Sequence, residues 1–280
     1  MSRPSSHVVH VQGIDLHYVD WGAPPGVDDA PTLFLLHGDM RTSRSWDAVA
    51  RRLCDRCRAL ALDSRGHGDS DWPDTGYTFA QRVDDLESFS DAIGMRNAVA
   101  VAHSTGGVVA TLLSERRPDI FSRLALLEPM VIVTESFQRM VSKRAEAPRR
   151  AWDSREDMYK YLKWHRMTGK WPDEVIRDVV AHESYQLPDG RLDTKWASSS
   201  MSWSEREGDY LDIKPALRTT GKPILFIMSD SRADQFRHLI PIAEQTPDFD
   251  LLTIPDSGHN MYMDQPAIVA EAVRRFAESG

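Results

Sequence analysis

The chain has 280 residues, of which 41% are hydrophobic and 27% are charged, a composition typical of soluble globular proteins that bury a sizeable core. Its formal net charge of −8 argues against nucleic acid or an anionic membrane as the main partner. Because the sequence has neither an apolar run that could span a bilayer nor a secretory signal, we expect a cytoplasmic protein, a monomer or homodimer that acts on a small molecule.

The N-terminal part of the chain predicts strands and one helix. Residues 7–22 alternate apolar and polar side chains around a glycine, which indicates an antiparallel hairpin. Residues 31–38 form a continuous apolar run, as expected of a strand that is buried on both faces. A helical period follows over 45–57, and a second buried strand begins at residue 58 and runs into a glycine-rich loop over 63–71.

The next segments alternate helix and strand. Residues 78–95 predict an amphipathic helix, because five apolar side chains share one of its faces. An apolar strand over 98–103, a glycine-initiated helix and a strand over 123–133 follow. This alternation indicates a parallel sheet with helices on both faces. The apolar face of the helix consists of Phe79, Val83, Leu86, Phe89 and Ile93.

The alternation stops over residues 134–214, which hold helix-like segments and five of the tryptophans, and it resumes with a strand over 222–230. We therefore expect a core over 1–133 and 215–280, with 134–214 inserted between two sheet strands as a helical cap. The tryptophans of this stretch are Trp152, Trp164, Trp171, Trp196 and Trp203.

Two motifs invite readings that the rest of the sequence does not support. Cys54 and Cys57 have the C-x-x-C spacing of redox and zinc sites, but no second cysteine pair exists, so we interpret them as reduced cysteines at a helix end. The loop over 63–71 is rich in glycine, yet its spacing does not match phosphate-binding loops, which favours a structural turn beside the site. We expect neither a metal nor a cofactor.

Ser104 is the candidate nucleophile. It stands between a strand and a helix, with the small residues Ala102 and Gly106 two positions to either side, as a sharp strand-to-helix turn requires. The helix N-terminus that follows favours negative charge. Alone the pattern is weak, and the alternative is a serine that only caps a helix.

A serine hydroxyl needs a base, and His259 is the candidate. It follows the last apolar strand and precedes the final helix, so it lies at the sheet edge where such sites assemble. The order serine, acid, histidine along the chain supports this interpretation.

The acid that orients the histidine has two candidate positions. Glu128 ends an apolar strand directly before Pro129, and such a carboxylate is costly to bury without a partner. Asp230 and Asp234 follow the next strand, with poorly fitting spacing. We favour Glu128, and its alternative role is a salt bridge at the base of the insertion.

The turn after the strand over 31–38 supplies a further element. The backbone N–H groups of Asp39 and Thr105 are predicted to form an oxyanion hole for a tetrahedral intermediate. The side chain of Asp39 would oppose an oxyanion unless it points away or is paired, so its role stays open between these possibilities and a contact to substrate or to a cap arginine.

Four segments now carry a family resemblance over essentially the whole chain: "LLHGDM", "DSRGHGDSD", "VAHSTGGVV" and "PDSGHNMYMDQP". In this order and at these separations the chain resembles the α/β-hydrolase superfamily. The resemblance implies an eight-stranded, mostly parallel sheet flanked by helices, with residues 134–214 as a cap. It implies Ser104 as nucleophile, His259 as base and the amides of Asp39 and Thr105 as the oxyanion hole. Members with the acid after the sixth strand support Glu128.

The resemblance also narrows the chemistry. Serine at the elbow argues against haloalkane dehalogenases and epoxide hydrolases, which resemble this core but use aspartate. The cap region is similar to small-molecule hydrolases of catabolic pathways, including those that act on amide-bearing dicarboxylates and ring-cleavage products. We expect cleavage of an ester, an amide or a carbon–carbon bond through an acyl-enzyme.

The cap sequence suggests what binds beneath it. Residues 139–170 contain ten Lys or Arg and four Asp or Glu, so a basic lid could hold a carboxylate-bearing substrate, although a solvated helix face would look the same. The tryptophans line an aromatic pocket or form the core of the cap. The pocket candidates are His37, His103, Trp152, Trp164 and Arg166.

Two other functions fit the same fold. Cofactor-free dioxygenases keep a histidine–acid pair and also read His-Ser at the elbow, but this chain lacks the tryptophan that they tend to carry after the first glycine turn. The second alternative is a non-catalytic ligand receptor.

Overall fold

An eight-stranded sheet forms the centre of the structure, a computed structural model that describes residues 4–27, 29–203 and 211–279. The strand order is β1-β2-β4-β3-β5-β6-β11-β12. β1, β2 and β4 pair antiparallel, and from β4 to β12 all neighbours are parallel. The strands are β1 (Ser5–Val11), β2 (Ile14–Asp20), β3 (Thr32–Leu36), β4 (Arg58–Leu62), β5 (Ala98–His103), β6 (Phe121–Leu127), β11 (Ile224–Ser229) and β12 (Phe249–Ile254).

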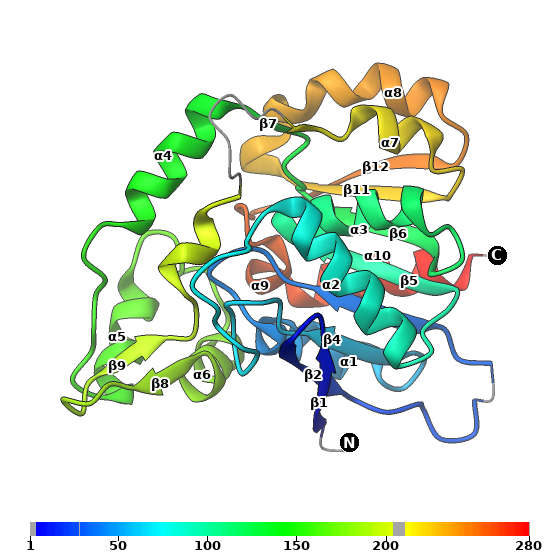
Figure 1. The fold of residues 1–280 in the computed structure, drawn as a ribbon. Helices are drawn as coiled ribbons and strands as arrows, with labels where there is room; N and C mark the ends of the chain where they lie inside the picture. The colour runs from blue at the N-terminus through cyan, green and yellow to red at the C-terminus, as the bar shows by residue number, and fades with distance from the viewer. Residues whose placement is uncertain (1–3, 28, 204–210, 280) are drawn as a thin grey trace.

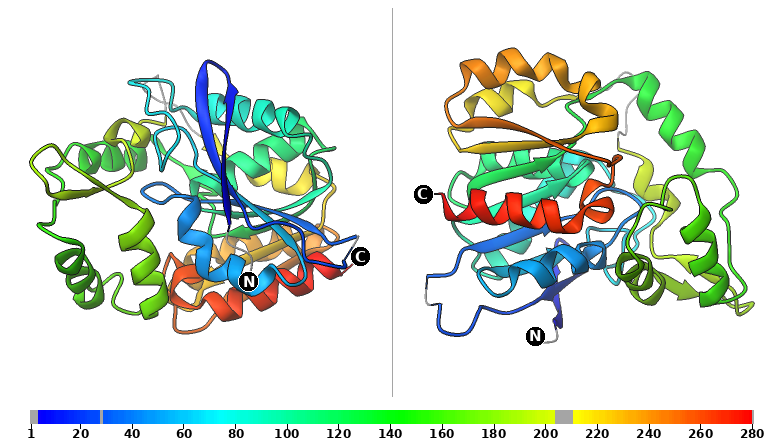
Figure 2. Two further views of the ribbon diagram at one scale, coloured as in Figure 1. Left: turned by 90° about the horizontal axis from the view of Figure 1, so that it is seen from below. Right: turned by 180° about the vertical axis from the view of Figure 1, so that it is seen from behind.

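Helices cover both faces of the sheet, because its central strands are apolar on both sides. In β3, Leu33 and Leu35 pack into one core cluster while Phe34 and Leu36 pack into the other. Figure 1 shows α2 and α3 on one face, and the view from behind in Figure 2 shows α1 and α10 on the other. Among the described residues, no helix is long and apolar enough to cross a membrane. The helices are α1 (Asp47–Leu53), α2 (Phe79–Ala92), α3 (Thr105–Arg116), α7 (Lys214–Thr219), α8 (Ile240–Gln245), α9 (Met261–Asp264) and α10 (Pro266–Glu278).

The strand predicted over 123–133 is wrong in its second half. β6 ends at Leu127, and Glu128 adopts a positive φ of 41° that bends the chain out of the sheet. Pro129 follows and cannot donate a hydrogen bond to a neighbouring strand. The chain resumes as β7 (Ile132–Val133), which pairs antiparallel with β10 (Leu211–Asp212).

Between β7 and β10 the chain forms a separate group of short elements beside the carboxyl ends of the parallel strands (Figure 1). Helix-like segments were expected here, whereas a two-stranded hairpin was not. The elements are α4 (Glu135–Ala145), α5 (Arg155–Trp164), α6 (Asp173–His182), β8 (Ser184–Gln186), β9 (Leu192–Thr194) and the 3₁₀ helix η2 (Ser198–Met201).

Two 3₁₀ helices precede α-helices of the core, and one of them replaces the start of a predicted helix. The helix expected over 45–57 begins as η1 (Ser43–Trp46) before α1, and the segment after β11 is η3 (Asp230–Leu239) before α8. Cys54 and Cys57 are both free and lie at the end of α1. Burial raises the pKa of the Cys57 thiol to about 11, so it stays protonated at neutral pH.

Candidate active site

Ser104 occupies a strained turn at the end of β5. Its φ of 52° and ψ of −118° are rare for a residue with a side chain, and they place it between His103 of β5 and Thr105, the first residue of α3. The turn tolerates no larger neighbour, since a Cβ on Gly106 would lie 2.6 Å from the carbonyl oxygen of His37. The small residues predicted around the serine therefore have a steric cause.

Glu128 and His259 lie in direct contact. Nδ1 of His259 is 2.7 Å from Oε2 of Glu128, although the two residues are 131 positions apart in sequence. Glu128 is buried, and its other oxygen accepts hydrogen bonds from the backbone N–H of Ser229 at 2.9 Å and from its hydroxyl at 2.6 Å. Three donors thus hold the carboxylate of Glu128 in one orientation, and its contact with Nδ1 fixes the orientation of the His259 ring.

The alternative acids have other partners. Asp230 is exposed and accepts hydrogen bonds from the backbone N–H groups of Asp256 at 2.8 Å and Ser257 at 3.1 Å, which lower the pKa of its carboxyl. Asp234 is exposed and pairs with Arg237 at 2.7 Å. Of the three acids, Glu128 alone contacts His259 in the part of the chain that the structure describes.

His103 supports the loop that carries His259. Its Nε2 donates to the carbonyl oxygen of His259 at 2.9 Å, and the two rings lie 4.6 Å apart between centroids. Burial, followed by the neighbouring His259, lowers the pKa of His103 well below its ordinary value, so its ring stays neutral. This neutral contact positions the loop without adding a charge beside His259.

The turn after β3 approaches Ser104 closely. A Cβ on Gly38 would lie 2.8 Å from Cβ of Ser104 and 2.8 Å from Nδ1 of His103, so only glycine fits there. Thr105 is the first residue of α3, and its N–H has no partner within the helix. Among the described residues, the N–H of Asp39 donates to no protein group.

The side chain of Asp39 is paired rather than free. Its Oδ1 accepts from Arg82 at 2.9 Å, and its Oδ2 accepts from the indole N–H of Trp203 at 2.7 Å. Arg82 also donates to the carbonyl oxygen of Ser200, so one carboxylate ties the turn after β3 to α2 and to the end of the insertion. The question that the sequence left open is thereby answered for this side chain, because its charge is balanced by Arg82.

A cavity of about 500 Å³ joins these groups. Ser104, Thr105, Glu128 and His259 line it from the strand ends, together with Asp39 and His103. The insertion contributes mostly apolar side chains, namely Phe137, Met140, Val141, Arg144, Met201 and Trp203. A concave, largely apolar site with a few convergent polar groups is the usual form of a small-molecule site.

Comparisons with known proteins agree with this architecture. The family model described as "Alpha/beta hydrolase family" matches residues 33–272. The chain belongs to the alpha/beta hydrolase family. This confirms the predicted superfamily and the predicted fold class, including the eight-stranded, mostly parallel sheet.

Relatives of this alpha/beta hydrolase span nearly its whole length. The 2-(acetamidomethylene)succinate hydrolase of Mesorhizobium japonicum is 26% identical, with 89% of this chain and 88% of the relative covered. Lipase LipV of Mycobacterium tuberculosis is 29% identical, with 93% and 97% covered. A crystal structure of E-2-(acetamidomethylene)succinate hydrolase matches the fold with a TM-score of 0.80 at 22% identity, covering 99% of this chain and 100% of that chain. The protein is an enzyme of the hydrolase class, as expected.

Four of the five pocket candidates lie outside the cavity of the hydrolase. His37 is buried and holds the turn after β3, with Nδ1 donating to the carbonyl oxygen of Gly38 at 2.7 Å. Trp152 is buried in a core cluster that it shares with residues of α6, whereas Trp164 is 85% exposed and Arg166 is also exposed. The assignment of these four residues to the pocket is therefore corrected, because the sequence does not show which way each side chain faces. His103 does line the cavity.

Among the cavity residues that received no role from the sequence are Arg41, Arg232 and Trp203. Arg41 lies two residues beyond the oxyanion turn, and Arg232 lies in the segment that we considered for the acid. Trp203 was counted among the tryptophans without a role. Both arginines lie close in sequence to Asp39 or Asp230, and this could have pointed to them. Whether their side chains face the cavity depends on the folded chain.

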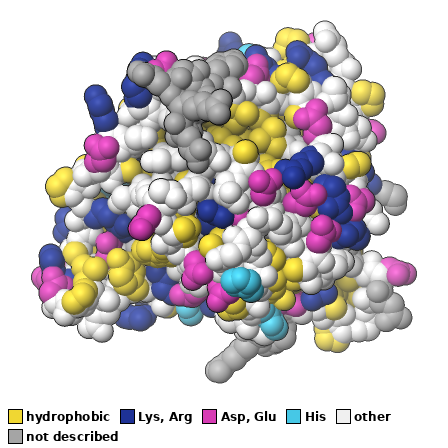
Figure 3. Space-filling model, viewed as in Figure 1, with side chains coloured by type: hydrophobic (Ala, Val, Ile, Leu, Met, Phe, Trp, Pro, Cys, Tyr) yellow, Lys and Arg dark blue, Asp and Glu magenta, His cyan; other side chains and the backbone are white. Residues whose placement is uncertain are grey.

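Five of the ten basic residues over 139–170 form ion pairs in the part of the chain that the structure describes, namely Arg139, Arg149, Lys160, Lys163 and Lys170. Lys163 pairs with Asp173 at 2.6 Å and Lys170 with Asp256 at 2.6 Å, and basic and acidic side chains lie beside each other on the face drawn in Figure 3. Such exposed pairs contribute little to stability. Arg144 of α4 differs, since it lines the cavity.

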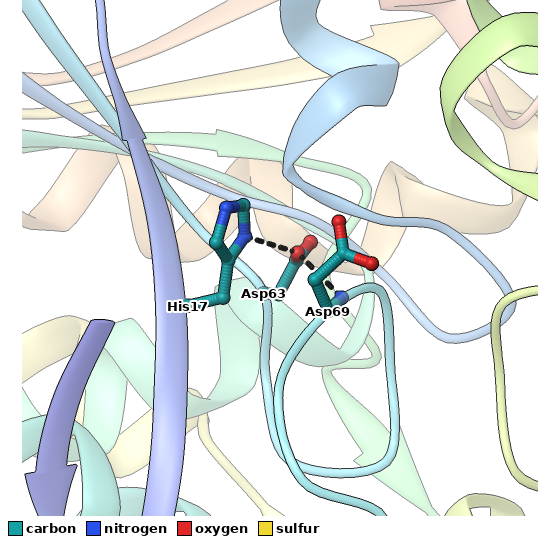
Figure 4. Close-up of side chains that lie close together, drawn as sticks. All are labelled: His17, Asp63 and Asp69. Carbon is teal, nitrogen blue, oxygen red and sulfur yellow. Dashed lines mark hydrogen bonds and ion pairs between the residues drawn. The ribbon is translucent and has the colours of Figure 1, made fainter. Parts of the chain in front are cut away.

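His17, Asp63 and Asp69 form a cluster whose ligand atoms lie within 4.8 Å of one another (Figure 4). Asp63 Oδ2 contacts His17 Nδ1 at 2.7 Å and also accepts from the backbone N–H of Asp69 at 3.0 Å. The carboxylate of Asp69 pairs with Lys195 at 2.5 Å. These groups are already engaged with one another, so the cluster fixes the glycine-rich turn after β4.

Proposed function

We propose that this enzyme is a serine hydrolase that cleaves an ester, an amide or a carbon–carbon bond of a small, carboxylate-bearing carbonyl compound through an acyl-enzyme on Ser104. The observation that carries the proposal is the contact between His259 and Glu128 at 2.7 Å, on the wall of the cavity that Ser104 also lines. Residues 134–214 act as the cap in this proposal.

The proposed reaction uses each residue in one role. Oγ of Ser104 attacks the carbonyl carbon while Nε2 of His259 takes the hydroxyl proton, because Nδ1 is occupied by Glu128. Glu128 stabilises the imidazolium that forms. The oxyanion lies on the backbone N–H groups of Asp39 and Thr105.

The second half of the reaction reverses the proton transfers. His259 donates its proton to the leaving group, which departs and leaves the acyl group on Ser104. Water then enters and His259 removes a proton from it while the water oxygen attacks the acyl carbonyl. The bond to Oγ of Ser104 breaks, and His259 returns the proton to Oγ as the carboxylic acid product leaves. The proposed mechanism uses neither a metal nor a cofactor.

Two observations support a substrate with a carboxylate. Three arginines, Arg41, Arg144 and Arg232, line the cavity, and the carboxylates of Asp39 and Glu128 on the same wall are bound by protein donors. The name of one relative, the 2-(acetamidomethylene)succinate hydrolase of Mesorhizobium japonicum, specifies an acetamido group and a succinate.

The test is covalent labelling followed by a substrate screen. We expect a fluorophosphonate probe to label the wild-type enzyme at Ser104, identified by mass spectrometry, and to leave Ser104→Ala unlabelled. Ester, thioester, amide and vinylogous-diketone substrates then assign the scissile bond. Full turnover by Ser104→Ala would contradict the proposal, and oxygen consumption in that case would identify a cofactor-free dioxygenase.

A further inference from the structure

Arg232 brings a cation to the acid of the active site. It lies on η3, just after β11, and β11 pairs in parallel with β6, the strand that ends at Glu128. Nε of Arg232 is 3.0 Å from Oε2 of Glu128, the oxygen that also contacts His259. The segment that we considered for the acid therefore delivers the opposite charge to the site.

The guanidinium of Arg232 has unused hydrogen-bonding capacity. Its Nε is near Glu128 but not aligned to donate to it, and among the described residues no group accepts a hydrogen bond from this side chain. The side chain is 38% exposed and lines the cavity. An arginine has five N–H donors and no means of losing its charge, so a ligand with paired oxygens matches what is left open.

Of the other charges on the cavity wall, Arg41 and Asp39 are paired, whereas Arg144, on α4 of the insertion, has no ion pair among the described residues. Arg41 pairs with Glu183 at 3.3 Å, and Asp39 pairs with Arg82 at 2.9 Å. Glu128 shares its charge between His259 and Arg232 and accepts two further hydrogen bonds from Ser229. When the imidazolium of His259 forms during turnover, it pairs with the carboxylate of Glu128. The guanidinium of Arg232 can then form an ion pair with a group of the substrate.

We propose that Arg232 is a specificity-determining residue that binds a carboxylate of the substrate on the side of Ser104 opposite the oxyanion turn. This inference rests on the proposed function. The strand order β3-β5-β6-β11 puts the turn of Asp39 on one side of Ser104 and Arg232 on the other. Neighbouring strands are roughly 4.8 Å apart, and the side chain reaches back to Glu128, so a carboxylate a few bonds from the scissile carbonyl fits.

The experiment compares two ethyl esters of nearly equal shape. Monoethyl succinate carries a carboxylate where ethyl 4-oxopentanoate carries a neutral acetyl group, and a coupled assay for ethanol follows both. We expect the wild-type enzyme to prefer monoethyl succinate. Arg232→Met should lower kcat/KM for that ester by about 10- to 100-fold, mainly through KM, and change the neutral ester less than threefold. Arg232→Lys should recover part of the loss, because it restores the charge without the planar fork.

Arg237→Met is the matched control. It removes the same charge from the same segment, but Arg237 is 75% exposed and pairs with Asp234. We expect it to leave both esters unchanged. Equal loss of activity on both esters in Arg232→Met would overturn the proposal, because Arg232 would then act only by positioning Glu128. A wild-type enzyme without preference between the esters would also overturn it.

Binding without turnover separates this proposal from the proposed function. In a Ser104→Ala background, calorimetry measures the affinity for monoethyl succinate with Arg232 present or replaced by methionine. A tenfold weaker affinity without Arg232 supports the carboxylate site even if fluorophosphonate labelling of Ser104 fails. Equal affinity, or no binding in either protein, would overturn the proposed carboxylate site at Arg232. The proposed acyl-enzyme on Ser104 would still be judged by the labelling experiment.

Discussion

The carboxyl edge of the sheet and the insertion between β7 and β10 face each other across one cavity, but they are built differently. At the sheet edge, polar groups follow buried strands and are held by short hydrogen bonds, such as those of Glu128 with Ser229 and His259. The insertion presents apolar side chains and an arginine, which contact the cavity with few fixed partners. From this contrast we infer that the reaction depends on polar groups whose positions are fixed by the ends of the strands. Selectivity then depends on the side chains that the insertion presents to the cavity. Substitutions of Ser104, Glu128 and His259 at the edge should therefore change kcat, whereas those of cavity side chains on the insertion, and of Arg232, should change KM.

The largest effect is expected at the nucleophile. Ser104→Ala should lower kcat by roughly 10⁴-fold or more, because binding and the oxyanion hole remain while the covalent step is lost. The measurement is kcat and KM on the best ester from the screen, with thermal unfolding to show that the variant folds. A reduction through KM alone would contradict the assignment of chemistry to the sheet edge.

Glu128→Gln tests the acid and should lower kcat by roughly 10³- to 10⁴-fold, because an amide cannot stabilise the imidazolium. Asp234→Asn provides the matched control, since Asp234 is exposed and pairs with Arg237 rather than with His259. Its kcat is expected to stay within twofold of the wild type. If Asp234→Asn were the more damaging change, the acid would lie after β11.

Asp39→Asn tests the link between the two regions. It leaves the buried guanidinium of Arg82 without its carboxylate, and breaking a buried ion pair costs about 3 kcal/mol in the free energy of unfolding. Trp203→Phe removes the indole N–H donor to Asp39 and leaves a smaller ring on the cavity wall, so a cost of about 1–2 kcal/mol in the free energy of unfolding and a higher KM are expected. Urea unfolding and steady-state kinetics measure both. A Trp203→Phe variant that lowers kcat and leaves KM unchanged would break the proposed division.

The buried carboxyl group of Glu183, a residue of the insertion, should make the stability of the protein depend on pH. Burial raises the pKa of its carboxyl to about 7, although Arg41 opposes this shift. The folded state therefore binds more protons than the unfolded state between about pH 4.5 and 7, and this group's contribution to stability declines as pH rises through that window. Glu183→Gln should remove the decline.

The measurement is the free energy of unfolding of both proteins between pH 5 and pH 8. Relative to the wild type, Glu183→Gln should gain on the order of 2 kcal/mol across this range. Parallel stability curves would mean that Glu183 is ionised throughout, paired with Arg41.

The sheet and the groups at its edge were predictable because each follows a local rule. Ser104 and His259 come directly after apolar strands, and Glu128 is a carboxylate that no apolar strand end would bury unpaired. The insertion offered no such rule. The indole of Trp203 and the guanidinium of Arg82 meet Asp39 across 164 and 43 positions of sequence, and such pairings are set by the folded chain rather than by local pattern.

The short pairing of β7 with β10 has a consequence beyond this active site. Because the chain leaves the sheet and returns to it at adjoining residues, a segment spliced there can be lengthened, shortened or exchanged without disturbing the register of β6 and β11. A change of substrate then requires no change in the reaction machinery. The segment between β7 and β10 can then be exchanged to alter selectivity while the reacting groups are kept, which is a favourable starting point for chimeric enzymes.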